Sequence, residues 1–146
     1  MVTGRKSRSR RADRATTLTG AAPRILVVED DIDLGETVCE ILRMSGYRAA
    51  HAVDGLVALE MLGAGGLHDL ILLDLMMPRM DGWAFRAAQL RDQRLKDIPV
   101  VVLSAMGEIP KAIDANSLLR KPVDPKILLD TVEKFIRRRS GSSRSK

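Results

Sequence analysis

Apolar residues along this chain gather in five short runs, and longer stretches separate the runs. The first and third runs are the clearest, because each is an unbroken apolar series that leads into an acidic residue. Unbroken runs of this length are typical of parallel strands that are buried on both faces. We predict strands at 24–29, 47–52, 69–74, 98–103 and around 118–120.

The stretches between these runs have apolar residues at helical spacing. The first stretch has an apolar face that includes Val38 and Leu42, and it stops at Gly46. Asp54 can cap the second helix, which breaks at the glycines after residue 62. We predict further helices at 82–93, as a short piece near 108–115, and from about 124 to 138.

Strands that alternate with helices predict a parallel sheet with helices on both faces. We expect one doubly wound α/β domain with strand order 2-1-3-4-5, in which sites form where the strands end. Polar residues stand at four of these ends. They are Glu29, Asp30 and Asp31 after the first strand, Asp74 after the third, Ser104 after the fourth and Lys121 after the fifth.

Three features meet at this edge of the sheet: an acidic cluster, a lone carboxylate and a lysine that precedes a proline. Carboxylates that lie close together cannot all stay ionised without a cation. A magnesium ion held by oxygen ligands resolves this repulsion. Lys121 offers a phosphoryl group a positive charge, and Ser104 offers it a hydroxyl donor. The set indicates phosphoryl transfer to a carboxylate.

Four segments, in this order, resemble the signatures of bacterial response-regulator receiver domains. They are Ile25-Leu-Val-Val-Glu-Asp-Asp31, Leu70-Ile-Leu-Leu-Asp-Leu-Met-Met-Pro78 with Met80-Asp-Gly82, Val101-Val-Leu-Ser-Ala105, and Lys121-Pro122. The resemblance covers about residues 24–138 and implies a flavodoxin-like fold. It also implies a role in two-component (phosphorelay) signal transduction, as a phosphoprotein that requires Mg²⁺.

The resemblance also implies roles for single residues. Asp74 matches the acceptor of the phosphoryl group. Glu29 and Asp30 match the acidic pair that binds Mg²⁺ directly or through water, with Asp30 as the direct ligand. Met76 would contribute its backbone carbonyl to the metal, together with the Asp74 carboxylate.

Two further roles concern the phosphoryl group itself. Ser104 matches the residue that hydrogen-bonds a phosphoryl oxygen and rearranges on activation. Lys121 matches the lysine that pairs with the phosphoryl group. Asp31 matches no required position, so we expect it to cap the first helix.

The sequence departs from the family pattern in two places. Leu118 stands where receivers usually have an aromatic residue, three positions before the lysine. Only 16 residues separate Ser104 from Lys121, fewer than is usual, so we expect a short or irregular fourth helix. Both changes lie near the face that usually carries output, and neither touches the acceptor.

The charge of the chain is unevenly distributed. Of the 146 residues, the first 24 contain seven Lys or Arg and one Asp, and residues 137–146 contain five Lys or Arg and no acid. Residues 25–136 then hold 12 basic and 18 acidic residues, a net charge of −6. We predict a basic disordered tail at 1–23, a receiver domain at 24–138 and a second basic disordered tail at 139–146.

Other features bear on location and partners. No apolar run approaches the length of a membrane span, the basic N-terminus lacks a signal-peptide core, and Cys39 cannot form an internal disulfide. We expect a cytoplasmic, stand-alone receiver whose partners are a histidine kinase or histidine phosphotransfer protein and a downstream protein. His51 and His68 belong to no motif and are predicted to be exposed or at an edge.

Three other interpretations compete with this one. A small phosphatase that uses Asp74 as nucleophile would need a general acid or base, and no spare residue of that kind stands out; we therefore expect no enzyme beyond slow self-dephosphorylation. An adaptor that binds nucleic acid through the basic tails is the second, and we expect it to be wrong. A degenerate receiver that works by binding alone is the third, and the intact acidic pair, acceptor and lysine argue against it.

Overall fold

A computed structural model of the chain describes residues 21–105 and 113–144, with the side chains of 140–144 excepted. Five parallel strands form one sheet in the order β2-β1-β3-β4-β5, as predicted. The strands are β1 (Arg24–Val28), β2 (Arg48–Ala52), β3 (Leu70–Asp74), β4 (Val100–Ser104) and β5 (Ser117–Arg120). The flavodoxin-like doubly wound fold is therefore confirmed.

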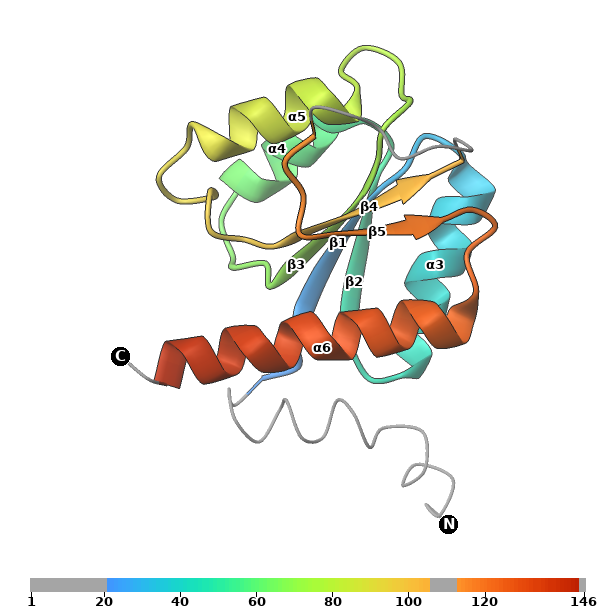
Figure 1. Cartoon of the computed structure of the whole chain (residues 1–146). Coiled ribbons are helices and arrows are strands. Elements are labelled where there is room, and N and C mark those ends of the chain that lie inside the picture. Colours follow the sequence, from blue (N-terminus) through green and yellow to red (C-terminus); the bar gives the residue numbers. More distant parts are fainter. Residues whose placement is uncertain (1–20, 106–112, 145–146) are drawn as a thin grey trace.

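Helices cover both faces of this sheet (Figure 1). One face carries α3 (Ile32–Met44) and α6 (Pro125–Arg144), and the other carries α4 (Gly55–Gly63) and α5 (Gly82–Leu90). In the described part of the chain, no helix combines the length and the apolar character that crossing a bilayer requires.

The central strands are buried on both faces, which explains their unbroken apolar runs. In β3, Leu70 and Leu72 point into the core under α3 and α6, whereas Ile71 and Leu73 point into the core under α4 and α5. All four side chains are fully buried. Burial of each stabilises the fold by about 1.5–3 kcal/mol.

An aspartate begins each of three helices. The carboxylates of Asp31, Asp54 and Asp81 accept hydrogen bonds from backbone N–H groups in the first turns of α3, α4 and α5. Such caps satisfy N–H groups that have no partner within the helix. The capping roles predicted for Asp31 and Asp54 are confirmed, and all three caps lie in loops that follow strands.

Some helix ends differ from the predictions. The helix α5 ends at Leu90, three residues before the predicted end, because Asp92 accepts a hydrogen bond from the Arg94 N–H (2.8 Å) and forms a turn. Residues 106–112, which include 108–112 of the short helix expected near 108–115, lie outside the described residues. Residues 113–115 have no regular secondary structure.

The predicted tails also need correction. The helix α6 continues to Arg144, so residues 139–144 are helical rather than part of a disordered tail. Arg139 fixes this end by donating from Nη1 to the Asp97 carbonyl oxygen (3.0 Å), a contact that the local sequence does not reveal. At the other end, Pro23 is ordered, because its carbonyl accepts from the Arg48 N–H (2.9 Å). Residues 1–20 of the predicted N-terminal tail lie outside the described residues.

His68 is buried, so the prediction that it is exposed or at an edge is wrong. His51 is half-buried and lies on β2, an edge strand of the sheet, so the same prediction is confirmed for His51. His68 retains only 4% of its surface, and burial together with the nearby Arg24 lowers its pKa. The His51 side chain is 6% exposed and makes polar contacts through both ring nitrogens. Tertiary contacts of this kind leave no trace in local periodicity.

Candidate functional site

The strands β1, β3, β4 and β5 bring the predicted site residues together at their carboxyl ends. Asp74 and Ser104 are the last residues of β3 and β4, whereas Glu29 and Lys121 directly follow β1 and β5. Parallel pairing places β1 and β4 on either side of β3 (Figure 1). Asp74 consequently lies at the centre of this edge.

Three carboxylates form a compact cluster. Oxygen atoms of Glu29, Asp30 and Asp74 all lie within 4.8 Å of one another. Glu29 and Asp74 are buried, whereas Asp30 is exposed and leaves the cluster open to solvent. An oxygen-rich set of this kind matches the ligands that a hard divalent cation prefers.

Burial and neighbouring charge act together on Asp74. Burial, the negative charge of Glu29 and a contact with the Asp30 carboxyl raise the pKa of Asp74 from 3.8 to about 7, although Lys121 opposes the shift. Ionisation of all three acids is therefore unfavourable in the protein alone. A cation in the cluster removes this penalty.

Lys121 supplies positive charge to the cluster. Its Nζ lies 2.8 Å from Glu29 Oε1 and donates a hydrogen bond to Asp74 Oδ1 over 3.3 Å. Burial alone would lower the pKa of Lys121, but these carboxylates more than reverse the effect and raise it. The amine therefore stays charged, as a partner of an anionic group must.

The carboxylates of the cluster are not fully neutralised by Lys121, so the cluster can bind a metal cation as well. Glu29 Oε2 accepts from the Asp31 N–H (3.1 Å), but Glu29 Oε1 is buried and forms no hydrogen bond among the described residues. Its contact with Lys121 lies outside hydrogen-bonding geometry and is an ion pair only. Three carboxylates against one lysine thus fit a site for Mg²⁺.

Ser104 and Lys121 are joined through the backbone. The Lys121 N–H donates to the Ser104 carbonyl oxygen over 2.9 Å, and Ser104 pairs with Arg120 in the sheet. The Ser104 side chain is buried, and the role predicted for its hydroxyl group stays a prediction.

Leu118, which stands in place of the usual aromatic residue, packs against the core between the sheet and the helices α4 and α5.

A glycine keeps the loop after Asp74 tight. A Cβ on Gly82 would lie only 2.7 Å from the Asp74 carbonyl oxygen, and the Gly82 N–H donates to the Leu75 carbonyl oxygen (2.9 Å). The glycine thus lets α5 begin directly beside the acceptor. Within this loop the Met76 side chain is exposed, and the use of its carbonyl as a metal ligand stays a prediction.

Sequence reasoning missed one residue beside the cluster. His51 Nε2 lies 2.7 Å from the backbone carbonyl oxygen of Glu29, and His51 Nδ1 lies 3.2 Å from Glu36 Oε2. No motif contains this histidine. The only local signal is Gly35, a glycine within a helix, where the residue type is unfavourable.

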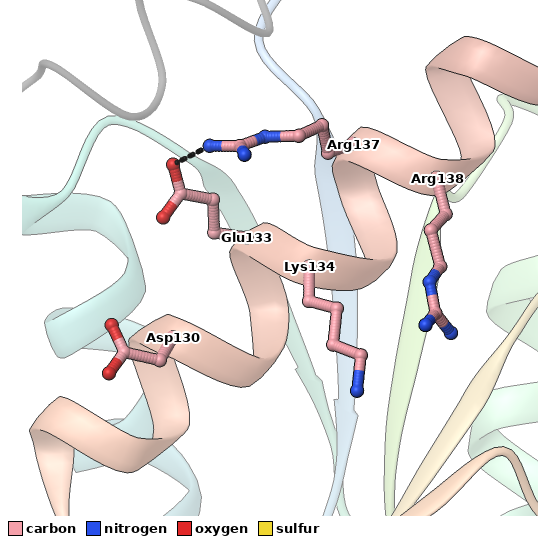
Figure 2. Close-up of a pocket in the computed structure, with 5 residues that line it drawn as sticks. All are labelled: Asp130, Glu133, Lys134, Arg137 and Arg138. Carbon is pink, nitrogen blue, oxygen red and sulfur yellow. Dashed lines mark hydrogen bonds and ion pairs between the residues drawn. The ribbon is translucent and has the colours of Figure 1, made fainter.

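A pocket along α6 lies away from these strand ends and is lined by mixed charges (Figure 2). Figure 2 shows Arg137 and Glu133 turned toward each other, joined over 2.7 Å, while Lys134 and Arg138 point to the other side. These two cations lie 5.9 and 5.6 Å from the centroid of the Phe135 ring. This surface holds no acidic cluster comparable to that at the strand ends.

Comparison with known families gives one clear match. The family described as the response regulator receiver domain matches residues 25–133. Two solved structures illustrate the likeness. The chemotaxis protein CheY4 of Vibrio cholerae is 30% identical (TM-score 0.73; 79% of this chain and 99% of that one). The receiver domain of a histidine kinase from Syntrophus aciditrophicus is also 30% identical (TM-score 0.73; 80% and 91%).

Curated relatives are longer proteins. The chain is 39% identical over 121 residues to the DNA-binding dual master transcriptional regulator RpaA of Synechocystis sp., covering 80% of this chain and 50% of that protein. It is 37% identical over 122 residues to the phosphate regulon transcriptional regulatory protein PhoB of Escherichia coli, covering 80% and 53%. The chain thus spans about half the length of these relatives, and the expectation that it stands alone stays a prediction.

Proposed function

Because the chain belongs to the response-regulator receiver domain family, we propose that Asp74 accepts a phosphoryl group in a two-component pathway. The donor is the phosphohistidine of a sensor kinase or a histidine phosphotransfer protein. A carboxylate oxygen of Asp74 attacks phosphorus and the N–P bond breaks. The imidazole, protonated on its other ring nitrogen, takes the bonding electrons and leaves as a neutral ring. The product is an acyl phosphate on Asp74.

One observation carries this proposal: Glu29, Asp30 and Asp74 form a cluster, and the Lys121 amine contacts two of these carboxylates, Glu29 and Asp74. Phosphoryl transfer needs positioning and charge neutralisation more than covalent chemistry. The Lys121 amine already contacts Asp74, and after transfer it would form an ion pair with the phosphoryl oxygens. Ser104 would donate a hydrogen bond to one of these oxygens.

The same cluster would hold Mg²⁺ through Glu29, Asp30, Asp74 and the Met76 carbonyl. Bound there, the ion would neutralise negative charge shared between the carboxylates and the phosphoryl oxygens. Asp30 is the exposed member and lies open to an ion arriving from solvent.

Phosphorylation would act as a signal rather than as a step in turnover. It adds roughly −1.5 to −2 charges and three acceptor oxygens beside Lys121 and Ser104. The loops that carry these residues would then shift between two arrangements that a partner protein distinguishes. We place this signalling in the cytoplasm and propose no catalytic activity beyond slow self-dephosphorylation.

A second candidate concerns output. RpaA and PhoB are named as transcriptional regulators, and RpaA as DNA-binding. Control of transcription by the phosphorylated domain, through a DNA-binding partner or segment, would fit these names. Direct DNA contact by the described residues is not proposed, because Arg137 is paired with Glu133 and the cluster face is acidic.

Labelling with acetyl phosphate tests the proposal. With Mg²⁺ present, the intact mass of the protein should increase by one phosphoryl group, and chelation of the metal should abolish this increase.

Mg²⁺ binding tests the metal ligands separately. Asp30→Ala should weaken Mg²⁺ binding about 10-fold or more. Asp33→Ala, which removes an exposed carboxylate outside the cluster on α3, is the matched control and should bind as the wild type does. Labelling that persists without divalent metal would count against the proposal.

A further inference from the structure

His51 makes a short contact with the backbone at the acidic cluster. Its Nε2 lies 2.7 Å from the carbonyl oxygen of Glu29. A carbonyl oxygen can only accept, so Nε2 carries the hydrogen in this contact. The His51 side chain is 6% exposed and comes from β2, whereas Glu29 directly follows β1. The contact is therefore a partly buried link between β2 and the end of β1.

With this contact, both backbone polar groups of Glu29 are hydrogen-bonded to residues of β2. The Glu29 N–H donates to the Ala52 carbonyl oxygen over 3.0 Å, which continues the ladder between β1 and β2. The Glu29 carbonyl belongs to the peptide that leads into Asp30. With both backbone groups of Glu29 engaged by β2, the backbone that leads into Asp30 is held in one orientation.

Gly35 leaves the space that the His51 ring occupies. A Cβ at this position would lie 2.1 Å from His51 Nε2 and 2.4 Å from Cε1, far inside any van der Waals contact. A glycine within a helix is less favourable than alanine, yet α3 has one in its first turns. The close approach of the ring explains why.

We propose that His51 is a positioning residue for the metal and phosphoryl site. Through its Nε2–H it holds the peptide between Glu29 and Asp30, and Gly35 makes room for the ring. His51 touches neither the metal nor the phosphoryl group. The proposal rests on the proposed function, in which Glu29 and Asp30 are metal ligands, and it adds a residue outside the family's motifs to that site.

Two substitutions of His51 test the hydrogen bond itself. His51→Leu fills similar space without a donor and should weaken Mg²⁺ binding about 10-fold, the typical effect of losing a residue that orients a ligand. His51→Gln retains an amide donor at the end of the side chain and should stay within about 3-fold of the wild type. Glu36→Gln changes only the contact at Nδ1 and should bind Mg²⁺ normally.

Gly35 offers an independent test. Gly35→Ala should displace the ring and weaken Mg²⁺ binding as His51→Leu does. Gly35→Ala combined with His51→Ala should melt at a higher temperature than His51→Ala alone, because the clash is absent and alanine favours the helix. Its Mg²⁺ affinity should nevertheless stay low. A purely structural role for His51 would move melting temperature and affinity together.

The Asp30 amide resonance in metal-free protein separates this proposal from the proposed function. His51→Leu and Gly35→Ala should shift it, and His51→Gln should leave it near its wild-type position. A wild type that binds no Mg²⁺ would defeat the proposed function, while these shifts would still decide the role of His51. Unchanged Asp30 resonances, or wild-type Mg²⁺ affinity in folded His51→Leu and Gly35→Ala, would overturn the proposal.

Discussion

Asp74 holds its position against an electrostatic penalty. Its carboxylate is buried beside Glu29 and Asp30, and among the described residues Lys121 is the cation that offsets the repulsion. A buried acid in such surroundings disfavours its charged form. The folded protein therefore carries a strained set of charges that a cation or a substitution can relieve.

A substitution that removes this penalty should increase the free energy of unfolding. Because the folded-state pKa of Asp74 is raised to about 7, its favourable contribution is full below about pH 4 and is lost as the pH rises through 7. In metal-free buffer near pH 8, Asp74→Asn should be more stable than the wild type by roughly 1–4 kcal/mol. The advantage should vanish toward pH 4, where both side chains are neutral. Urea unfolding across this range measures it, and equal stability near pH 8 would contradict the account.

The sequence predicts most of this site but not all of it. Glu29, Asp30, Asp74 and Lys121 follow apolar runs, and parallel strands bring such residues to one edge. The structure places all four there. His51 could not be found this way, because its contact with Glu29 depends on the pairing of β1 with β2 and on the space above Gly35.

At the scale of elements, the loop after β3 is tied to the start of α4. Asp54 accepts from the Val57 N–H (3.0 Å) and from Arg79 Nε (2.7 Å), and Arg79 has a left-handed backbone conformation with φ 65°. Burial opposes ionisation of Asp54, but these hydrogen bonds outweigh it and lower its pKa. The same carboxylate thus caps α4 and holds the loop that follows the acceptor.

Asp54→Ala should destabilise the protein by about 1–3 kcal/mol at neutral pH, since it removes the cap and leaves Arg79 without its partner. Because the folded-state pKa is lowered, the contribution is present above the unfolded pKa near 4 and fades as the pH falls through the lower folded value. Arg79→Ala should cost less, because the Arg79 side chain is 57% exposed. Denaturant unfolding of both variants tests this order; a larger loss for Arg79→Ala would refute it.

Element types and strand order could be predicted because they depend on local periodicity and on the rules of parallel sheets. Element ends could not. The end of α5 depends on the turn at Asp92, and the extra turns of α6 depend on a contact between Arg139 and Asp97. These are hydrogen bonds of the folded chain rather than features of a local pattern.

At the scale of the whole molecule, the proposed function requires a signal to pass from Asp74 to a surface that a partner recognises. The edge strand β5 and α6 offer one candidate surface, and Leu118 in β5 packs against the core under α4 and α5. Leucine has no ring to swing and no polar tip to change partners. A two-state element needs contacts that differ between its states. The contacts of Leu118 should therefore change little when Asp74 is phosphorylated.

We expect phosphorylation to change β5 and α6 only slightly and to cause no dimer through them. The change should instead concentrate in α3 and in the loops after Asp74 and Ser104. Amide exchange with and without beryllofluoride, a phosphoryl mimic, would measure this. Strong protection across residues 111–120 and α6, together with a new dimer, would show that the β5 face carries output.

The most direct test of the account is to locate the phosphoryl group. After reaction with acetyl phosphate and Mg²⁺, peptide mass spectrometry should find an acid-stable, base-labile phosphoryl group on Asp74 alone. Asp74→Asn should take up none while keeping its fold. Asp69→Asn, a matched change at the residue directly before β3, should label as the wild type does. Undiminished labelling of Asp74→Asn, or a group mapped to another residue, would contradict the assignment.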